Sequence, residues 1–169
     1  MQRLKEFIPT YKDFPKKGIS FKDVLEIVQE PEIFRELIFE MSSNHIIKNS
    51  QAIVSIDARG FIFGSAIALQ SSKPMIFARK PGKLPGDVIT ESYNLEYGEN
   101  SLSIQKKALN KYDSYSIVDD LVATGGTAKS VANILQKEGK KITGLLTVVA
   151  LEDVVREKFN FPLDSMIIM

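Results

Sequence analysis

Four short apolar runs constrain the fold of this chain more than any other feature of its sequence. They occupy residues 52–56, 75–78, 115–118 and 145–149. Because almost every position in them is apolar, each is expected to be a strand buried on both faces. Strands of this kind are typical of a parallel sheet that is covered on both sides.

Helical patterns separate these runs. The first helix can begin at Pro31 and places apolar residues on one face at four-residue spacing. Two more are expected over residues 60–69 and 128–137, and Gly139 is placed to end the second of them. The alternation predicts the α/β class, with a parallel twisted sheet flanked by helices. Residues 159–169 are expected to form a last edge strand with an apolar tail, covered by the fold or by a partner.

Length and charge narrow the function. The chain has 169 residues, enough for one domain over residues 1–169. Its 22 Lys and Arg residues nearly balance its 21 Asp and Glu residues, leaving a net charge of +1. This balance does not support binding that depends on a basic surface, so no nucleic-acid partner is expected.

The sequence contains no cysteine, which excludes disulfides, thiolate nucleophiles and cysteine metal sites. The first residues lack the apolar run of a signal peptide, and no uncharged stretch of about 18 residues could span a bilayer. We therefore expect a cytoplasmic protein with no membrane partner.

One segment interrupts the alternation. From residue 80 to residue 100 the chain holds two prolines and three glycines among charged and aromatic residues. Connections in compact domains usually have about 4–6 residues, so this one is long. Leu102 and Ile104 follow with the alternation of a strand, which favours an antiparallel hairpin arm over disorder. We interpret residues 80–104 as a mobile lid over a site.

The richest chemistry follows the third apolar run. A buried strand is expected to end in Asp119 and Asp120, and a loop of small residues then begins a helix. Glycine permits the backbone angles that aim several N–H groups at one point, and the helix dipole adds positive potential. The predicted phosphate cradle consists of Ala123, Thr124, Gly125, Gly126 and Thr127.

The two carboxylates beside this loop suggest a sugar. A ribose diol could donate to one or both, with Mg²⁺ near the sugar. A lone Asp-Asp pair is more often a helix cap and surface turn, but the whole string favours a site. The loop matches neither Gly-x-x-x-x-Gly-Lys-Ser/Thr nor Gly-x-Gly-x-x-Gly, which argues against nucleoside triphosphatases and dehydrogenases.

Residues 117–127 resemble the phosphoribosyl-pyrophosphate signature of type I phosphoribosyltransferases. The Ala-Thr-Gly-Gly-Thr form of the loop is similar to that of members acting on adenine. The resemblance covers nearly the whole chain. It implies that Asp119 and Asp120 hold the ribose hydroxyls and that the loop of residues 123–127 holds the 5′-phosphate.

The amino-terminal segment, residues 1–30, carries a second resemblance. Residues 13–23 are similar to the motif that forms the purine pocket in this family, which implies base binding by Ser20, Phe21 and Lys22. Phe21 can stack on a base, and backbone groups beside it can read the base edge. Standing alone, the segment would be a turn leading to a core Phe. Many members have Pro at position 17 and an apolar residue at position 20.

Four cations are candidates for binding pyrophosphate. Arg59 follows the first strand and precedes a helix, and an Arg pairs with phosphate in a bidentate manner. The resemblance to the family's Arg-Gly-Phe motif favours this role over a surface salt bridge. Residues 79–86 resemble a segment implicated in pyrophosphate binding and dimer contacts, which implies roles for Arg79, Lys80 and Lys83. Alone, they would be a solvated charge run.

Residues 91–98 resemble the family's mobile catalytic loop. The resemblance implies that Glu96 is a candidate proton donor to the purine and that Tyr97 helps to cover the site. His45 is the only histidine and continues the spacing of the first helix, so we expect a helix-face or helix-end residue. No His, Asp or Glu set has metal-ligand spacing, so Mg²⁺ is expected to arrive with the diphosphate.

Together these resemblances imply a purine salvage enzyme. It would transfer the phosphoribosyl group of 5-phosphoribosyl-1-pyrophosphate to adenine, giving AMP and pyrophosphate, and it would be a homodimer. Two alternatives remain at this stage. One is a phosphoribosyltransferase for hypoxanthine, guanine or xanthine, and the other is a non-catalytic nucleotide-binding regulator of the same fold.

Overall fold

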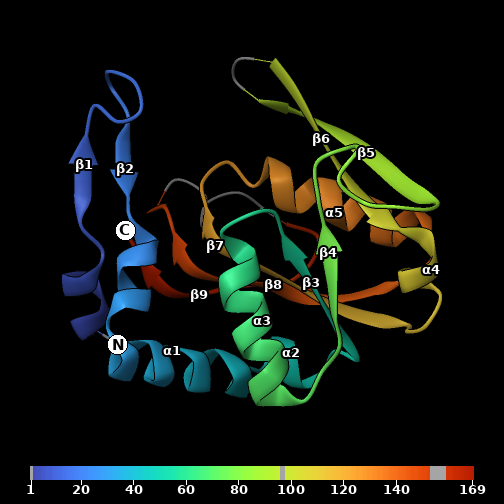
Figure 1. The fold of residues 1–169 in the computed structure, drawn as a ribbon, viewed down its shortest axis with the longest axis horizontal. Helices are drawn as coiled ribbons and strands as arrows, with labels where there is room; N and C mark the ends of the chain where they lie inside the picture. Colours follow the sequence, from blue (N-terminus) through green and yellow to red (C-terminus); the bar gives the residue numbers. More distant parts are fainter. Residues whose placement is uncertain (1, 96–97, 153–158) are drawn as a thin grey trace.

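The computed structural model describes residues 2–95, 98–152 and 159–169. At its centre is a five-stranded sheet in which all neighbouring strands are parallel (Figure 1). The strands, from one edge to the other, are β4 (Met75–Ala78), β3 (Ala52–Ile56), β7 (Ser114–Val122), β8 (Lys141–Ala150) and β9 (Leu163–Ile168). The four predicted strands and the predicted edge strand are confirmed. The expectation that all four runs are buried on both faces is wrong for β4, which lies at the edge of the sheet with Phe77 exposed.

Helices cover both faces of this sheet (Figure 1). One face carries α1 (Pro31–Ser43), α2 (His45–Lys48) and α3 (Gly60–Ser71), together with the 3₁₀ helices η1 (Gln2–Phe7) and η2 (Val24–Gln29). The other face carries α5 (Gly126–Lys137) and the short α4 (Lys106–Leu109). The predicted helices at Pro31, 60–69 and 128–137 are confirmed.

Each face of the sheet has its own hydrophobic core. On one side Leu37 and Met41 of α1 meet Phe63 and Ile67 of α3. On the other side the apolar residues of α5 pack against the sheet. Because both faces are dry, the central strands carry apolar side chains at nearly every position, which is why they read as continuous apolar runs.

Two antiparallel hairpins flank the sheet. The first pairs β1 (Thr10–Lys12) with β2 (Ser20–Lys22), and the second pairs β5 (Val88–Leu95) with β6 (Gly98–Gln105). The second confirms the predicted hairpin arm. The main chain of Ser103 joins that of Arg79 just beyond β4, with N–O distances of 2.9 and 2.7 Å. The hairpin therefore starts from the edge of the sheet.

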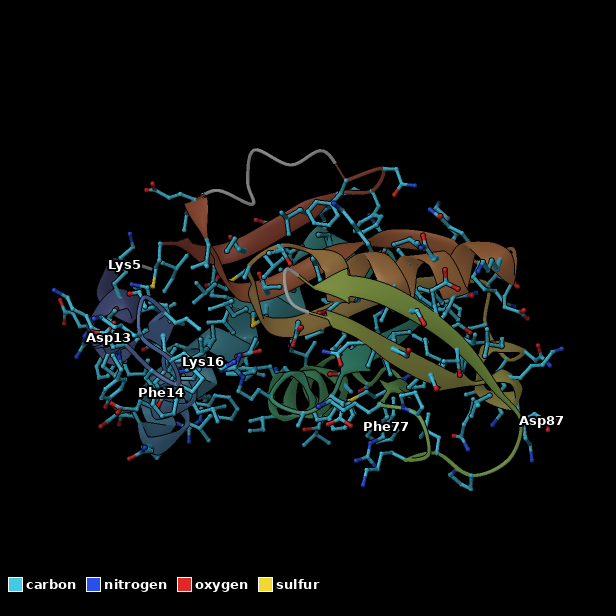
Figure 2. The ribbon with its side chains drawn as sticks, turned by 90° about the horizontal axis from the view of Figure 1, so that it is seen from above. Lys5, Asp13, Phe14, Lys16, Phe77 and Asp87 are labelled. Carbon is cyan, nitrogen blue, oxygen red and sulfur yellow. The ribbon has the colours of Figure 1, made fainter. Side chains whose placement is uncertain are left out.

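Seen from above, the two hairpins lie on opposite sides of the molecule (Figure 2). Asp13, Phe14 and Lys16 mark the loop of the β1–β2 hairpin, whereas Asp87 marks the start of the β5–β6 hairpin. The carboxyl ends of the central strands lie between them.

Two details differ from the sequence-based expectations. Strand β7 continues to Val122, because Leu121 and Val122 stay paired with β8, so the acidic pair lies within the strand instead of at its end. The first helix ends before Asn44, whose side-chain oxygen accepts a hydrogen bond from Ile46 N at 2.9 Å and caps α2. His45 is the exposed first residue of a separate short helix, which agrees with the expected helix-end position although the helix is not the expected one.

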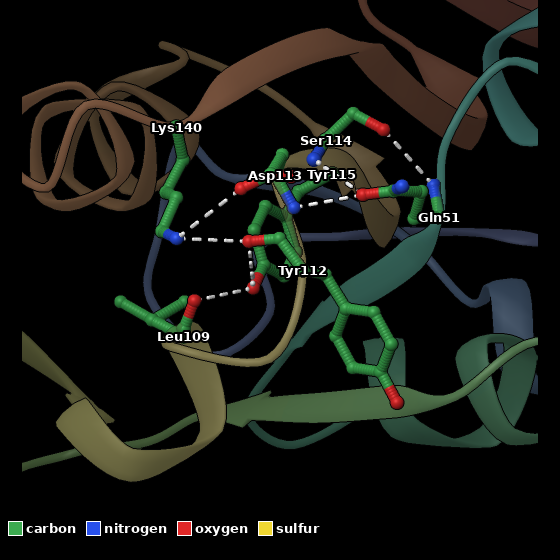
Figure 3. Close-up of polar contacts among 7 residues, drawn as sticks. All are labelled: Gln51, Leu109, Tyr112, Asp113, Ser114, Tyr115 and Lys140. Atoms are coloured by element: carbon green, nitrogen blue, oxygen red, sulfur yellow. Dashed lines mark hydrogen bonds and ion pairs between the residues drawn. The ribbon is translucent and has the colours of Figure 1, made fainter.

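A polar cluster at the amino end of β7 holds the connection from α4 in place (Figure 3). The buried hydroxyl of Tyr115 donates to the carbonyl oxygens of Leu109 at 2.9 Å and Tyr112 at 3.2 Å. Burial raises the pKa of Tyr115 to about 12. Gln51 Oε1 accepts from Asp113 N at 2.8 Å, and Lys140 Nζ donates to Tyr112 O at 2.9 Å. These contacts fix the end of the sheet opposite the carboxyl ends.

Across the part of the chain that the structure describes, every helix is too short or too polar to cross a bilayer.

Candidate active site

A cavity of about 570 Å³ lies at the carboxyl ends of β3 and β7. Residues 56–59, 119–125 and 127–128 line it, together with Leu145. Parallel sheets bind ligands at this end of their strands, and the volume falls within the range of small-molecule sites. The cavity thus brings together the predicted acidic pair, Arg59 and most of the predicted phosphate loop.

The loop before α5 is built for an anion. Gly125 is the residue before the helix, with φ +73°, a left-handed conformation that favours glycine. Glycine has no side chain with which to cap the helix, and the structure shows no side-chain cap from this position. The first N–H groups of α5 are therefore available to a bound phosphate, and Ala123 and Thr124 beside them are exposed.

Phe159 lies against this loop from a distant part of the chain. A Cβ atom at Gly125 would lie 2.5 Å from Phe159 Cζ, so the ring leaves no room for a side chain. The Lys129 ammonium lies 5.4 Å from the centre of the same ring. Glycine at position 125 is therefore required both by the backbone angle and by the contact.

The acidic pair is packed against the start of α3. Asp119 Oδ1 accepts from Asp120 N at 2.9 Å, and a Cβ at Gly60 would lie 2.7 Å from the same oxygen. The Asp120 side chain is 4% exposed, and its Oδ2 lies 3.0 Å from Arg59 Nε. The two carboxylates therefore face the cavity from a largely dry setting.

Burial changes the acidity of both carboxyls. Burial raises the pKa of Asp119 well above its usual range, and the neighbouring Asp120 carboxylate raises it further. Burial also raises the pKa of Asp120, while the Arg59 guanidinium opposes that rise. Two partly desolvated carboxylates side by side are stabilised by hydroxyl donors. This is what a sugar diol would supply.

Arg59 links the acidic pair to the amino-terminal hairpin. Its Cζ lies 5.4 Å from the centre of the Phe21 ring, and Phe21 in turn meets Phe14 edge-on at 5.2 Å. Phe21 does not itself line the cavity, but it contacts Arg59, which does. The other two predicted base-binding residues are placed differently: Lys22 Nζ donates to Thr10 Oγ1 at 2.8 Å within the hairpin, and Ser20 is exposed.

The other predicted cations do not line the cavity. Arg79 Nε lies 2.9 Å from Asp57 Oδ2, and Arg79 Nη1 donates to Lys83 O at 3.3 Å. Lys80 and Lys83 are exposed on the segment that follows β4. Asp57 lines the cavity, so Arg79 is connected to the cavity through its ion pair with Asp57. Glu96 and Tyr97 lie outside the described residues.

Sequence reasoning overlooked several residues of this site. Asp57 and Leu121 line the cavity and each lies within two residues of one that the motifs marked, so proximity in the sequence was an available signal. Phe159 had no such signal, because it lies 34 residues beyond Gly125, and only the folded structure brings the two together.

Among the described residues, no group of three or more His, Cys, Asp and Glu side chains could hold a metal ion. Asp119 and Asp120 offer carboxylate oxygens in the cavity, but these are too few to form a complete coordination shell for Mg²⁺.

Comparison with known proteins gives a consistent result. Residues 22–158 match the phosphoribosyl transferase domain family. A protein named adenine phosphoribosyltransferase from Prochlorococcus marinus subsp. pastoris is 66% identical over 166 residues, covering 98% of this chain and 97% of the relative. One of the same name from Mycoplasmopsis synoviae is 40% identical, with 98% of each chain covered.

Solved structures show the same likeness. The adenine phosphoribosyltransferase of Thermoanaerobacter pseudethanolicus is similar with a TM-score of 0.91 and 32% identity over 99% of each chain. The Saccharomyces cerevisiae enzyme, solved with an imino-altritol bisphosphate and adenine, is similar with a TM-score of 0.87 and 32% identity, covering 98% of this chain and 97% of that one.

Proposed function

The chain belongs to the phosphoribosyltransferase family, and from that premise we propose that it makes AMP for purine salvage. It transfers the 5-phosphoribosyl group of 5-phosphoribosyl-1-pyrophosphate to adenine and releases pyrophosphate. The observation that carries the proposal is one cavity in which a buried acidic pair, an arginine and a helix-capping glycine loop meet.

The ribose phosphate is held at two points. The loop of residues 123–127 and the first turn of α5 receive the 5′-phosphate, because their N–H groups and helix dipole favour an anion. Asp119 and Asp120 accept hydrogen bonds from the ribose hydroxyls. Fixing both ends of the sugar orients its anomeric carbon, and such positioning can remove much of the entropic barrier to the reaction.

We assign binding of the diphosphate to the four basic side chains singled out in the sequence. Arg59 is already in the cavity and can turn from Asp120 to the diphosphate once the ribose hydroxyls satisfy that carboxylate. Lys80 and Lys83, with Arg79, would stabilise the negative charge of the leaving diphosphate once the segment after β4 moves toward the cavity. Support for these three is their position on the segment tied to the cavity by the Arg79–Asp57 ion pair.

Mg²⁺ fits as a companion of the donor. Of the three carboxylates in the lining, Asp57 is paired with Arg79, which leaves Asp119 and Asp120 to contact the ion. The diphosphate and sugar oxygens with water would complete the coordination. Mg²⁺ neutralises part of the diphosphate charge when bound. This chain's residues supply the remaining positive charge and the orientation.

In the reaction the bond from the anomeric carbon to the diphosphate oxygen breaks, and its electron pair leaves with the diphosphate. The ring nitrogen of adenine then bonds to that carbon and loses its proton. We propose that Glu96 accepts this proton in the direction of AMP synthesis and donates it to the purine in the reverse direction. We assign the covering of the site to Tyr97. Both roles rest on the resemblance of residues 91–98. Residues 80–104 would act as the lid that excludes water, which would otherwise hydrolyse the donor.

Base binding is assigned to the β1–β2 hairpin. Phe21 would stack on adenine, and backbone groups at Ser20 and Lys22 would read its edge. The contact between Phe21 and Arg59 supports this, because it puts the ring beside the sugar site.

We also propose that the protein is a cytoplasmic homodimer with one domain over residues 1–169. Helix α3 is apolar on nearly every side, yet its Leu69 is 84% exposed, and Phe77 on the adjacent edge strand β4 is 43% exposed. A helix of this composition is usually buried on all sides. A second copy of the chain against α3 and β4 would provide that cover.

The test is AMP formation from adenine, 5-phosphoribosyl-1-pyrophosphate and Mg²⁺, with hypoxanthine and guanine in parallel. Turnover confined to adenine is expected. Turnover with an oxopurine alone would contradict the base assignment but keep the donor site. Saturable nucleotide binding without turnover on any base would instead favour a regulator. Glu96→Ala should lower kcat with a smaller effect on the KM for the donor.

A further inference from the structure

Glu91 lies at the point where the β5–β6 hairpin leaves the body of the protein. Its cross-strand partner is Leu102, which is 2% exposed and belongs to the core beneath α5. Burial on β6 falls beyond this pair: Ser103 and Leu102 are buried, Ser101 is half-buried and Asn100 is exposed. Glu91 therefore marks the boundary between a docked half and a projecting half.

Three side chains of α5 converge on Glu91. Ser130 Oγ donates to its carbonyl oxygen at 3.1 Å, Lys137 Nζ lies 2.5 Å from Oε2, and Asn133 Nδ2 makes a long contact of 3.5 Å with Oε1. Positions 130, 133 and 137 fall on one face of a helix. The Glu91 side chain is 18% exposed whereas that of Lys137 is 62% exposed, so the carboxylate is held against the protein while the ammonium stays in contact with solvent.

The same helix begins at the phosphate loop. Gly126 is the first residue of α5, and Ser130 follows four residues later, about 6 Å along the axis at 1.5 Å per residue. Strands β5 and β6 run alongside α5 and extend past the carboxyl ends of the sheet (Figures 1 and 2). The contacts of Glu91 with α5 therefore fix the position of the projecting half of the hairpin relative to the phosphate loop.

We propose that Glu91 is a positioning residue for the reaction. By docking the hairpin on α5, it sets where residues 92–95 and 98–101 lie relative to the phosphate loop. The inference rests on the proposed function, in which this hairpin covers the cavity. An ordinary surface ion pair would instead add modestly to stability and leave turnover unchanged.

The experiment compares Glu91→Gln, Lys137→Glu and the charge-exchanged double variant E91K/K137E with the wild type. The matched control is Asp87→Asn, an exposed acid at the start of the same hairpin. Two quantities are measured: kcat and KM at saturating partner substrate, and amide hydrogen exchange of residues 92–95 and 98–101. Thermal melting confirms that each variant folds.

We expect Glu91→Gln to lower kcat about tenfold, because covering steps commonly limit turnover. The KM for the donor should stay within about twofold, since the cradle itself is unchanged. Exchange of the projecting half should accelerate. The double variant should recover kcat to within about threefold of the wild type and slow the exchange again, because it restores the ion pair with reversed polarity. Asp87→Asn should match the wild type.

Faster exchange with unchanged kcat would show docking without positioning and would overturn the proposal. So would a fall in kcat that the double variant does not recover, or an equal fall in Asp87→Asn. These results leave the proposed function standing. Wild-type protein that makes no AMP from adenine would instead overturn the proposed function, and the role of Glu91 with it.

Discussion

The Nε of Arg59 lies 3.0 Å from Oδ2 of Asp120. Its guanidinium also lies 5.4 Å from the centre of the Phe21 ring. Arg59 thus contacts both Asp120, the carboxylate proposed to bind the ribose, and Phe21, the ring proposed to stack on the base. In the proposed mode of binding, the donor and adenine would both bind only after this arrangement changes.

Adenine should therefore bind more tightly once the sugar site is filled. Ribose hydroxyls would take over Asp120, and Arg59 would leave the face of Phe21. Calorimetric titration of adenine, with and without saturating ribose 5-phosphate, should show at least about tenfold tighter binding in its presence, which is about 1.4 kcal/mol. In Arg59→Ala the difference between the adenine affinities measured with and without ribose 5-phosphate should become smaller. Equal adenine affinity in both titrations of the wild type would contradict this arrangement.

Removing the two anchors of the sugar phosphate should weaken donor binding specifically. Asp120→Asn with Thr124→Ala removes a charged acceptor and a hydroxyl donor that line the cavity. A hydrogen bond to a charged group contributes about 1.5–3 kcal/mol, so the KM for the donor should rise more than about tenfold. Initial-rate kinetics measure this, with the KM for adenine as the internal control. An unchanged donor KM would rule out the cradle.

Asp119→Asn should stabilise the protein near neutral pH while impairing donor binding. The folded-state pKa of Asp119 is raised by burial, so the folded protein favours the protonated form. That contribution to stability is fully present below the unfolded pKa, about 3.9, and is lost as the pH rises through the folded pKa.

The amide removes the buried charge and can still accept from Asp120 N. Melting at pH 7.5 should thus occur about 2–4 °C above the wild type, and the difference should vanish near pH 3.5. A lower melting temperature at pH 7.5 would show that the ionised carboxylate is stabilising in place.

Gly125→Ala should raise the donor KM by more than tenfold, about 1.4 kcal/mol or more, because it combines a left-handed backbone angle with a clash on Phe159. Adding Phe159→Ala removes the clash and leaves the angle. The double variant should consequently recover part of the loss, and Phe159→Ala alone is the control. No recovery would assign the whole effect to the backbone.

Leu69→Lys should shift the protein to monomers if α3 and β4 form the proposed interface. Light scattering after size-exclusion chromatography measures the mass at micromolar concentration. Ile168→Lys is the matched control, because Ile168 is 46% exposed on β9 at the opposite edge of the sheet. A wild-type monomer, or equal dissociation in the control variant, would remove this assignment.

Local patterns in the sequence determined much of this protein. The apolar runs at 52–56 and 75–78 match β3 and β4 residue for residue. For β3 the reason is that a strand buried on both faces needs apolar side chains throughout. The run of β4 did not show that this strand lies at the edge with Phe77 exposed. The phosphate loop was also readable, because Gly125 and its neighbours form a local turn whose requirements are carried by adjacent residues.

Contacts between distant segments were decided only by the tertiary structure. The Arg59–Asp120 pair, the Phe159 ring on Gly125 and the docking of Glu91 on α5 join residues separated by 61, 34 and at least 39 positions. No local periodicity encodes such pairs. The Arg59–Asp120 pair forms because the sheet order β4-β3-β7-β8-β9 places β3 beside β7, so that their carboxyl ends meet at one end of the sheet. Glu91 reaches α5 because the separate β5–β6 hairpin is joined to the chain beyond β4 through Arg79 and Ser103.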